Sequence, residues 1–140
     1  MADLSQTAGS VAPSTNNVIE RRFNFGGTVT AGMPVYLSAA NTWIAADNNV
    51  STLEAGLYGC GIALNGGASG QPAAVQVGGD INIGATLTAG VPYIVSSNAG
   101  AIAPITDIST NYTTVLGVAI SASILRMPGS GPIVTGVAHG

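Results

Sequence analysis

The sequence predicts an all-β protein: a small barrel or sandwich built from two tandem related repeats, preceded by a flexible N-terminal arm. Three observations lead to this fold class. Apolar runs rich in β-branched and aromatic residues are short, and turns drawn from 20 glycines and 7 prolines separate them. No segment shows a sustained helical period with caps at its ends. One stretch of turn and strand sequence occurs twice.

The duplicated stretch reads TVTAGMPVYLS at residues 28–38 and TLTAGVPYIVS at residues 86–96, an offset of 58 residues. The same offset aligns residues 57–59 with residues 115–117. In both copies an alternating Thr-x-Thr segment precedes Ala-Gly, and a proline opens a run of β-branched and aromatic residues. Glycine supplies the positive φ that a tight turn can need, and proline is tolerated at the first position of a strand. Each copy is therefore predicted to be two strands joined by a turn.

The repeats are expected to extend over about 26–79 and 84–139. A repeat of roughly sixty residues is marginal alone, so the two are expected to share a core within one domain, residues 21–140. Residues 1–20 are mostly Ser, Thr, Asn, Gln and Ala without periodicity, which indicates a flexible arm.

Short apolar runs mark the remaining strands. A first strand is expected within residues 19–25, and glycines at 78–79 and 84 are expected to separate later strands. The other predicted strands are residues 57–64, 71–77, 80–83, 85–88, two within 113–125, and 133–137.

Two single residues are expected in the core. Trp43, the only tryptophan, is predicted to fill space between sheets with its indole N–H bonded to backbone. Cys60, the only cysteine, lies between two glycines in an apolar run and is predicted to be a small buried side chain. The run from Gly59 lacks the third glycine and the following helix of a dinucleotide-binding site.

Charged side chains make up 6 % of the chain, against about a quarter in ordinary soluble proteins, and there is no lysine. Three arginines face six acidic residues, for a formal net charge of −3. Nucleic-acid binding requires clustered cationic side chains, so no nucleic-acid partner is expected. A surface of small neutral residues suits a protein that is normally packed against copies of itself or a lattice.

Two of the three arginines, Arg21 and Arg22, lie beside Phe23 and Phe25 at the root of the arm. Two interpretations are open. The segment is an ordinary surface hairpin, or it is a docking point for the carboxylates of a partner. In the second interpretation these four residues contact a partner protein or a neighbouring protomer.

No catalytic, metal or cofactor site is predicted. The only histidine, His139, is next to the C-terminal residue, and acid–base catalysis needs a base placed beside an acid or nucleophile. Asp47 and Asp107 fall at similar places in the two repeats, but capping of loops explains them better than a paired-carboxylate or calcium site. The chain is therefore expected not to be an enzyme.

No apolar run approaches the roughly 20 residues of a spanning helix, so no membrane partner is expected. The N-terminal residues MADLSQ lack the basic and apolar regions of a secretory signal, which predicts a protein made in the cytoplasm.

Several phrases resemble small β-rich proteins of tailed bacteriophages, the capsid decoration or cement proteins. They are residues 61–72 (GIALNGGASGQP), 79–96, 102–104 and 115–119. The resemblance covers about residues 56–138 and implies a virion protein that binds the outside of the assembled shell. It also implies homotrimers that clamp neighbouring major capsid protein subunits. The arm and the segment Arg21 to Phe25 would then grip the capsid or a neighbouring protomer.

The alternative is a ligand-binding β module, such as a glycan-binding or tail-fibre domain. A glycan platform requires exposed aromatic rings, whereas a cement protein needs such rings buried or at protein contacts. Solvent exposure of Trp43 and Tyr112 distinguishes the two functions.

Overall fold

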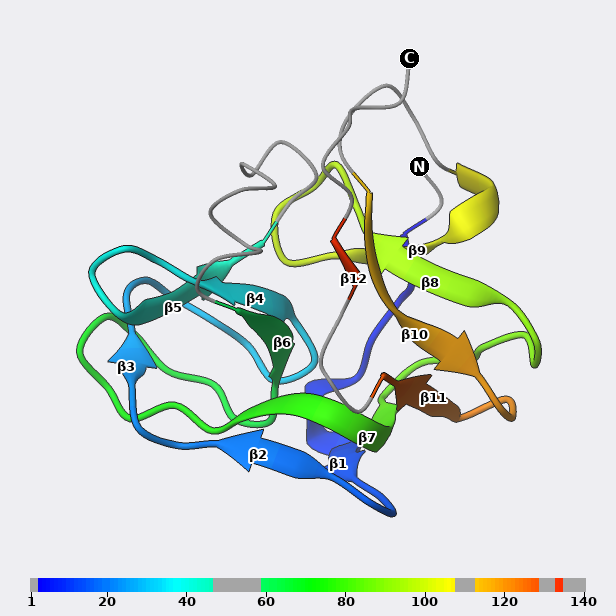
Figure 1. The fold of residues 1–140 in the computed structure, drawn as a ribbon, viewed down its shortest axis with the longest axis horizontal. Coiled ribbons are helices and arrows are strands. Elements are labelled where there is room, and N and C mark those ends of the chain that lie inside the picture. The colour runs from blue at the N-terminus through cyan, green and yellow to red at the C-terminus, as the bar shows by residue number, and fades with distance from the viewer. Residues whose placement is uncertain (1–2, 47–58, 108–112, 129–132, 135–140) are drawn as a thin grey trace.

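The computed structural model describes residues 3–46, 59–107, 113–128 and 133–134 (Figure 1). Regular structure in these residues is almost entirely β, which confirms the predicted fold class. The helical segments described are two three-residue 3-10 turns, and neither could span a bilayer. In chain order the elements are η1 (Ala8–Ser10), β1 (Val11–Pro13), β2 (Val18–Glu20), β3 (Asn24–Phe25), β4 (Pro34–Leu37), β5 (Thr42–Ala45), β6 (Cys60–Ala63), β7 (Val75–Ile83), β8 (Pro92–Val95), β9 (Ile102–Pro104), η2 (Ile105–Asp107), β10 (Thr114–Ala119), β11 (Ile124–Met127) and β12 (Ile133–Val134).

The strands form one open sheet in the order β3-β5-β4-β6-β7-β11-β10-β8-β9, with β1 and β2 added to β7 and β12 to β10. The order has internal symmetry, because β5-β4-β6-β7 in the first repeat corresponds to β9-β8-β10-β11 in the second. Figure 1 shows the first repeat on the left and the second on the right, with β7 running below both. Since the order does not return to its start, the sheet is not a closed barrel, and the architecture is consistent with a sandwich.

The two copies of the turn fold alike. The amide of Gly32 donates to the carbonyl oxygen of Ala63 at 2.8 Å, and the amide of Gly90 donates to that of Ala119 at 2.7 Å. Gly32 and Gly90 have φ values of 95° and 87°, which strain any residue with a Cβ. Each turn therefore needs its glycine, and it bonds to the third strand of its own repeat, which is β6 in the first repeat and β10 in the second.

The pairing of β4 with β6 and of β8 with β10 also corrects the predicted alignment between the two repeats. Pro34 lies opposite Ile62 in the first repeat, and Pro92 lies opposite Val118 in the second. Ile62 therefore corresponds to Val118, and the matching phrases are Gly-Ile-Ala-Leu-Asn from residue 61 and Gly-Val-Ala-Ile-Ser from residue 117. The alignment of residue 59 with residue 117 is therefore wrong, because Gly61 takes the place that corresponds to Gly117, while residues 57–58 lie outside the described residues.

Strand β7 is continuous through the glycines that were expected to break it. Gly79 takes a φ of 87° within the strand, so the chain passes through residues 78–79 without ending the pairing. One edge of β7 pairs with β6 and then with β11. The other edge pairs with β2 and then with β1. A single strand thus joins both repeats and has partners along both edges.

Residues 3–20, hereafter the strap, were predicted to be flexible, and this prediction is wrong. The strap runs antiparallel along β7, with Val11 opposite Ile83 and Val18 opposite Gly78. Between the two strands, the amide of Ser14 donates to the carbonyl oxygen of Asp80 at 2.8 Å. The polar composition of the strap does not prevent this pairing, because backbone N–H and C=O groups make the hydrogen bonds. The free edge of β7 accepts such a strand whatever side chains the strand carries.

The apolar side chains form two cores. An outer core lies within the first repeat and comprises Phe25, Val29, Val35, Leu37, Trp43, Ala63, Ala73 and Val75. A central core lies between the repeats and comprises Ala46, Cys60, Ile62, Ile81, Ile83, Leu87, Tyr93, Val95, Ile102, Leu116, Ala119, Leu125 and Met127. The shared core predicted from the length of the repeats is the central one.

Trp43 and Cys60 are buried, as predicted. The indole N–H of Trp43 has no hydrogen-bond partner among the described residues, which differs from the expected bond to backbone. Burial raises the pKa of the Cys60 thiol to about 12, so the thiol is not a nucleophile near neutral pH.

Candidate functional surface

The predicted contact residues lie where the strap ends and the first repeat begins, between β2 and β3. Glu20 closes β2, and the backbone then bends through residues 21–23 before Asn24. The guanidinium of Arg22 reaches back to Glu20, with Nε 2.9 Å from Oε1 and Nη2 2.9 Å from Oε2. The same guanidinium lies over the ring of Phe23, with its central carbon 5.2 Å from the ring centroid.

These contacts hold Arg22 in place but leave it in solvent. Its side chain is 76 % exposed, and the bidentate geometry lowers the pKa of Glu20, chiefly through the side-chain hydrogen bond from Arg22. A surface ion pair of this kind contributes little to stability. Arg22 could therefore exchange Glu20 for a carboxylate of a partner at little cost to the fold. Arg21 is also exposed and has no ion-pair partner among the described residues.

Phe25 does not belong to this surface. Its side chain is fully buried in the outer core, so its prediction as a contact residue does not fit the structure. Phe23 is half-buried and packs against the same core. Val18 of β2, which precedes Arg21 by three residues in the chain, is 48 % exposed. Val18, Arg21, Arg22 and Phe23 are hereafter the strap corner.

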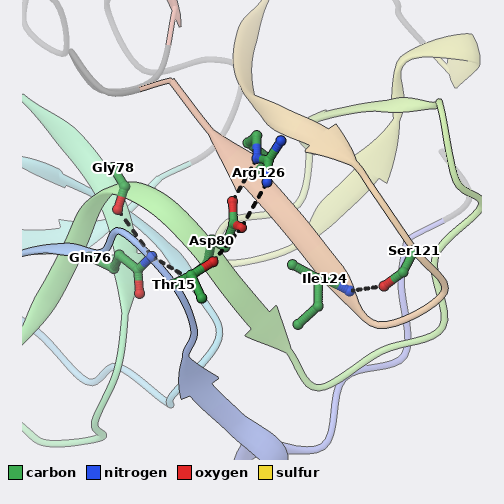
Figure 2. A network of polar contacts seen from close by, with 7 residues as sticks. All are labelled: Thr15, Gln76, Gly78, Asp80, Ser121, Ile124 and Arg126. Carbon is green, nitrogen blue, oxygen red and sulfur yellow. Dashed lines mark hydrogen bonds and ion pairs between the residues drawn. The ribbon is translucent and has the colours of Figure 1, made fainter.

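A polar network fixes the strap to both repeats (Figure 2). Asp80 of β7 accepts hydrogen bonds from Arg126 of β11, with Nε 2.8 Å from Oδ1 and Nη2 3.0 Å from Oδ2. The hydroxyl of Thr15 in the strap donates to Asp80 Oδ2 at 2.8 Å. The buried amide Nε2 of Gln76 donates to the carbonyl oxygens of Gly78 at 3.1 Å and Asp80 at 2.9 Å.

The electrostatics of this network are those of a structural ion pair. The hydrogen bonds from Arg126 hold the pKa of Asp80 below its usual range, and the bond from Thr15 adds to this effect. Asp80 is only 4 % exposed, and burial disfavours its charge, but the hydrogen bonds from Arg126 outweigh this effect. A carboxylate in this setting cannot act as a proton donor near neutral pH.

Each described carboxylate has a polar partner within the chain. Asp3 accepts hydrogen bonds from the hydroxyl of Ser96 and, at 2.7 Å, from the side-chain Nδ2 of Asn98, and Glu20 and Asp80 are paired with arginines. Within the described ranges no three His, Cys, Asp or Glu side chains come together in a way that could hold a metal ion. Asp47, Glu54, His139, Tyr112 and the side chain of Asp107 lie outside what the structure describes.

A second exposed surface was missed by the sequence analysis. Val118 at the end of β10 is 39 % exposed, and Ile120, which follows the strand, is 43 % exposed. Their counterparts in the first repeat, Ile62 and Leu64, are fully buried and half-buried. The repeated Gly-x-Ala-x phrase was the available signal, but the register chosen for the repeat did not align its two copies.

The aromatic side chains bear on the alternative function. Trp43 is 2 % exposed and Tyr93 is 3 % exposed, and the Tyr93 hydroxyl accepts a hydrogen bond from the amide of Thr88 at 2.9 Å. Neither ring can serve as a binding platform in this conformation. Comparisons of the chain with models of known protein families, with curated proteins and with solved structures find no match.

Proposed function

We propose that this chain is a structural protein of a bacteriophage particle. It binds the outer surface of the capsid and stabilises it by clamping neighbouring major capsid protein subunits, acting as a homo-oligomer of three copies. The proposal rests on the resemblance in the turn and strand phrases and on the character of the surface.

The observation that carries the proposal is the near-neutral surface. Within the described residues, every charged side chain except Arg21 is held by a polar partner in the same chain. Most of the other exposed residues in the strap and loops are Ala, Ser, Thr, Gly and Asn. When another protein covers such a surface, little side-chain entropy is lost and few ions are desolvated. A protein that spends its working life attached to a shell benefits from both.

The strap corner is the surface proposed to meet the capsid. It offers the guanidinium of Arg21, which has no ion-pair partner within the described ranges, a second guanidinium in Arg22 that Glu20 can release, and apolar area from Val18 and Phe23. Arginine with neighbouring apolar side chains is typical of residues that dominate binding at protein interfaces. Three copies would present three such corners, which adds avidity to weak single contacts.

The alternative is a ligand-binding β module. The burial of Trp43 counts against a glycan platform, because that function requires an exposed ring. Tyr112, the other ring that separates the two functions, lies outside the described residues.

The test is co-sedimentation of the purified protein with phage heads from which the protein has been stripped. Saturable binding in a fixed ratio to the major capsid subunit is expected. Replacing Arg21 and Arg22 together by alanine should weaken this binding, whereas Gln71→Ala, at an exposed side chain in a loop of the first repeat, should not. A well-folded protein that does not bind heads would rule out the capsid function and direct attention to a glycan screen.

A further inference from the structure

The chain offers very few peptide bonds to a protease that selects basic residues. It has no lysine, and its three arginines are Arg21, Arg22 and Arg126, all within the described residues. Such a protease binds the arginine side chain in an acidic pocket and hydrolyses the bond that follows it. The bond must also lie in a segment of chain that can leave its place in the fold. The two locations of arginine in this fold differ in that respect.

The bond that follows Arg126 is enclosed in the sheet. β11 pairs with β7 on one side and with β10 on the other. The neighbours Leu125 and Met127 are 0 % and 2 % exposed and belong to the central core. The carbonyl oxygen of Arg126 also packs against the backbone of Gly117, where a Cβ would overlap it. A protease therefore reaches this bond only when the central core opens.

The other two arginines lie in the link between β2 and β3, residues 21–23, which belongs to no strand. Arg21 and Arg22 are both exposed, and Arg21 has no ion-pair partner among the described residues. Arg22 is held by Glu20, which lies two residues away in the same segment. Either guanidinium can therefore enter an acidic pocket without disturbing either core.

The strand before the link can leave the sheet without uncovering a buried side chain of its own. β2 pairs with β7 alone among the described strands, and Figure 1 shows it at the periphery of the molecule. None of residues 18–20 is fully buried, and Val18 is 48 % exposed. The pairing is also irregular, because its register shifts between Val18 and Ile19. Local opening of β2 is therefore easier than opening of β11, and it frees the chain around the link.

We infer that residues 21–23 are a processing site, at which a serine protease selective for basic residues separates the strap from the two folded repeats. In the net reaction water adds across the bond that follows Arg21 or Arg22. Its hydroxyl joins the arginine carbonyl carbon, and its proton goes to the nitrogen of the next residue. The strap then becomes a separate peptide, held by its pairing with β7 and by the bond from Thr15 to Asp80. This inference goes beyond the capsid function and does not rest on it.

The first experiment treats the folded chain with trypsin and follows the fragments by mass spectrometry. Cleavage after Arg21 or Arg22 should be about tenfold or more faster than cleavage after Arg126, because cleavage rates follow the population of the open form. The chain unfolded in urea should be cut after all three arginines, since only the fold protects Arg126. The double variant Arg21→Gln, Arg22→Gln should stay intact under conditions that cleave the folded wild type. Equal rates at the link and at Arg126, or a folded wild type that is not cut, would overturn the inference.

The second experiment tests whether opening of β2 controls the cleavage. Thr15 precedes β2, and its hydroxyl bonds to the carboxylate of Asp80. Thr15→Val removes this bond and favours opening, so trypsin should cut the link of this variant several-fold faster than that of the wild type. The matched control is Ser121→Ala, which removes a hydroxyl that accepts a bond from the amide of Ile124 in the second repeat, and its link should be cut at the wild-type rate. Equal rates for Thr15→Val and the wild type would contradict cleavage through opening of β2.

Discussion

Replacing Gln6 by alanine should loosen the start of the strap where it meets both repeats. The amide Nε2 of Gln6 donates to the carbonyl oxygen of Gly32 at 2.8 Å and to that of Ile83 at 2.9 Å. Gly32 lies in the turn of the first repeat, and Ile83 ends β7 before the second turn. One half-buried side chain therefore bonds to two backbone carbonyl groups that lie 51 residues apart in the chain.

The expected loss follows from these two bonds. Each neutral hydrogen bond contributes about 1 kcal/mol net, so Gln6→Ala should lower the free energy of unfolding by about 2 kcal/mol. For a domain of this size that corresponds to a fall of about 6 °C in the thermal unfolding midpoint. Gln6→Glu keeps the shape but faces both carbonyl oxygens with a carboxylate, so its loss should be at least as large.

Differential scanning calorimetry measures the midpoint, and hydrogen exchange measures the protection of the amide of Thr7, which donates to the carbonyl oxygen of Gly84. Exchange at Thr7 should accelerate in Gln6→Ala before the β4 amides are affected. The control is Gln71→Ala, because the exposed Gln71 side chain bonds only to the amide of Ala68 in its own loop. Equal midpoints for wild type and Gln6→Ala, with unchanged exchange at Thr7, would refute the role assigned to the strap.

Three further outcomes follow from the described contacts. Asp80→Asn should lower the free energy of unfolding near neutral pH. Because the pKa of Asp80 is lowered in the folded state, the wild type should keep its advantage above about pH 4 and lose it as the pH falls through that lowered pKa. Urea unfolding of both proteins at a series of pH values measures this difference. Gly117→Ala should cost about 1–3 kcal/mol, since its Cβ would overlap a backbone carbonyl oxygen of β11, whereas Gly27→Ala has open space and should unfold like wild type in the same assay. Replacing exposed Arg21 and Arg22 by alanine should leave the thermal midpoint nearly unchanged while reducing binding to heads, and a large fall in the midpoint would make the pair structural.

The sequence predicted the fold class and the glycine turns before β4 and β8 because these depend on local chemistry. The strand predicted before each turn is wrong, since Val29 makes only an isolated bridge to Gly67 and residues 85–88 belong to no strand. Positive φ at Gly32 and Gly90 and proline at the first position of β4 and β8 follow from residue type alone. The strap could not be predicted in the same way. Its attachment depends on backbone groups, which every residue has, and on which edge of β7 is left without a partner.

The candidate site was only partly predictable for a related reason. Alternation places Phe23 and Phe25 on one side of the chain, but it does not say whether that side faces the core or the solvent. The exposed Val118 and Ile120 required the correct register between repeats, because a shift of two residues pairs each of them with the wrong counterpart. Ile62 is buried and its counterpart Val118 is exposed because of where each repeat lies in the assembled sheet, and the sequence of neither repeat shows this.

The central position of β7 has a consequence for how the chain acquires its fold. Val11 and Val18 are synthesised long before their partners Ile83 and Gly78, and β11 follows later still. Neither edge of β7 can therefore be completed by neighbours in sequence, and loop closure must precede most of the pairing. Folding should be slow for a domain of this length, and the early strap must stay soluble on the ribosome while it waits. The strap has no long apolar run, and this composition is also typical of disordered segments. The same composition disfavours aggregation of the strap while it is unpaired.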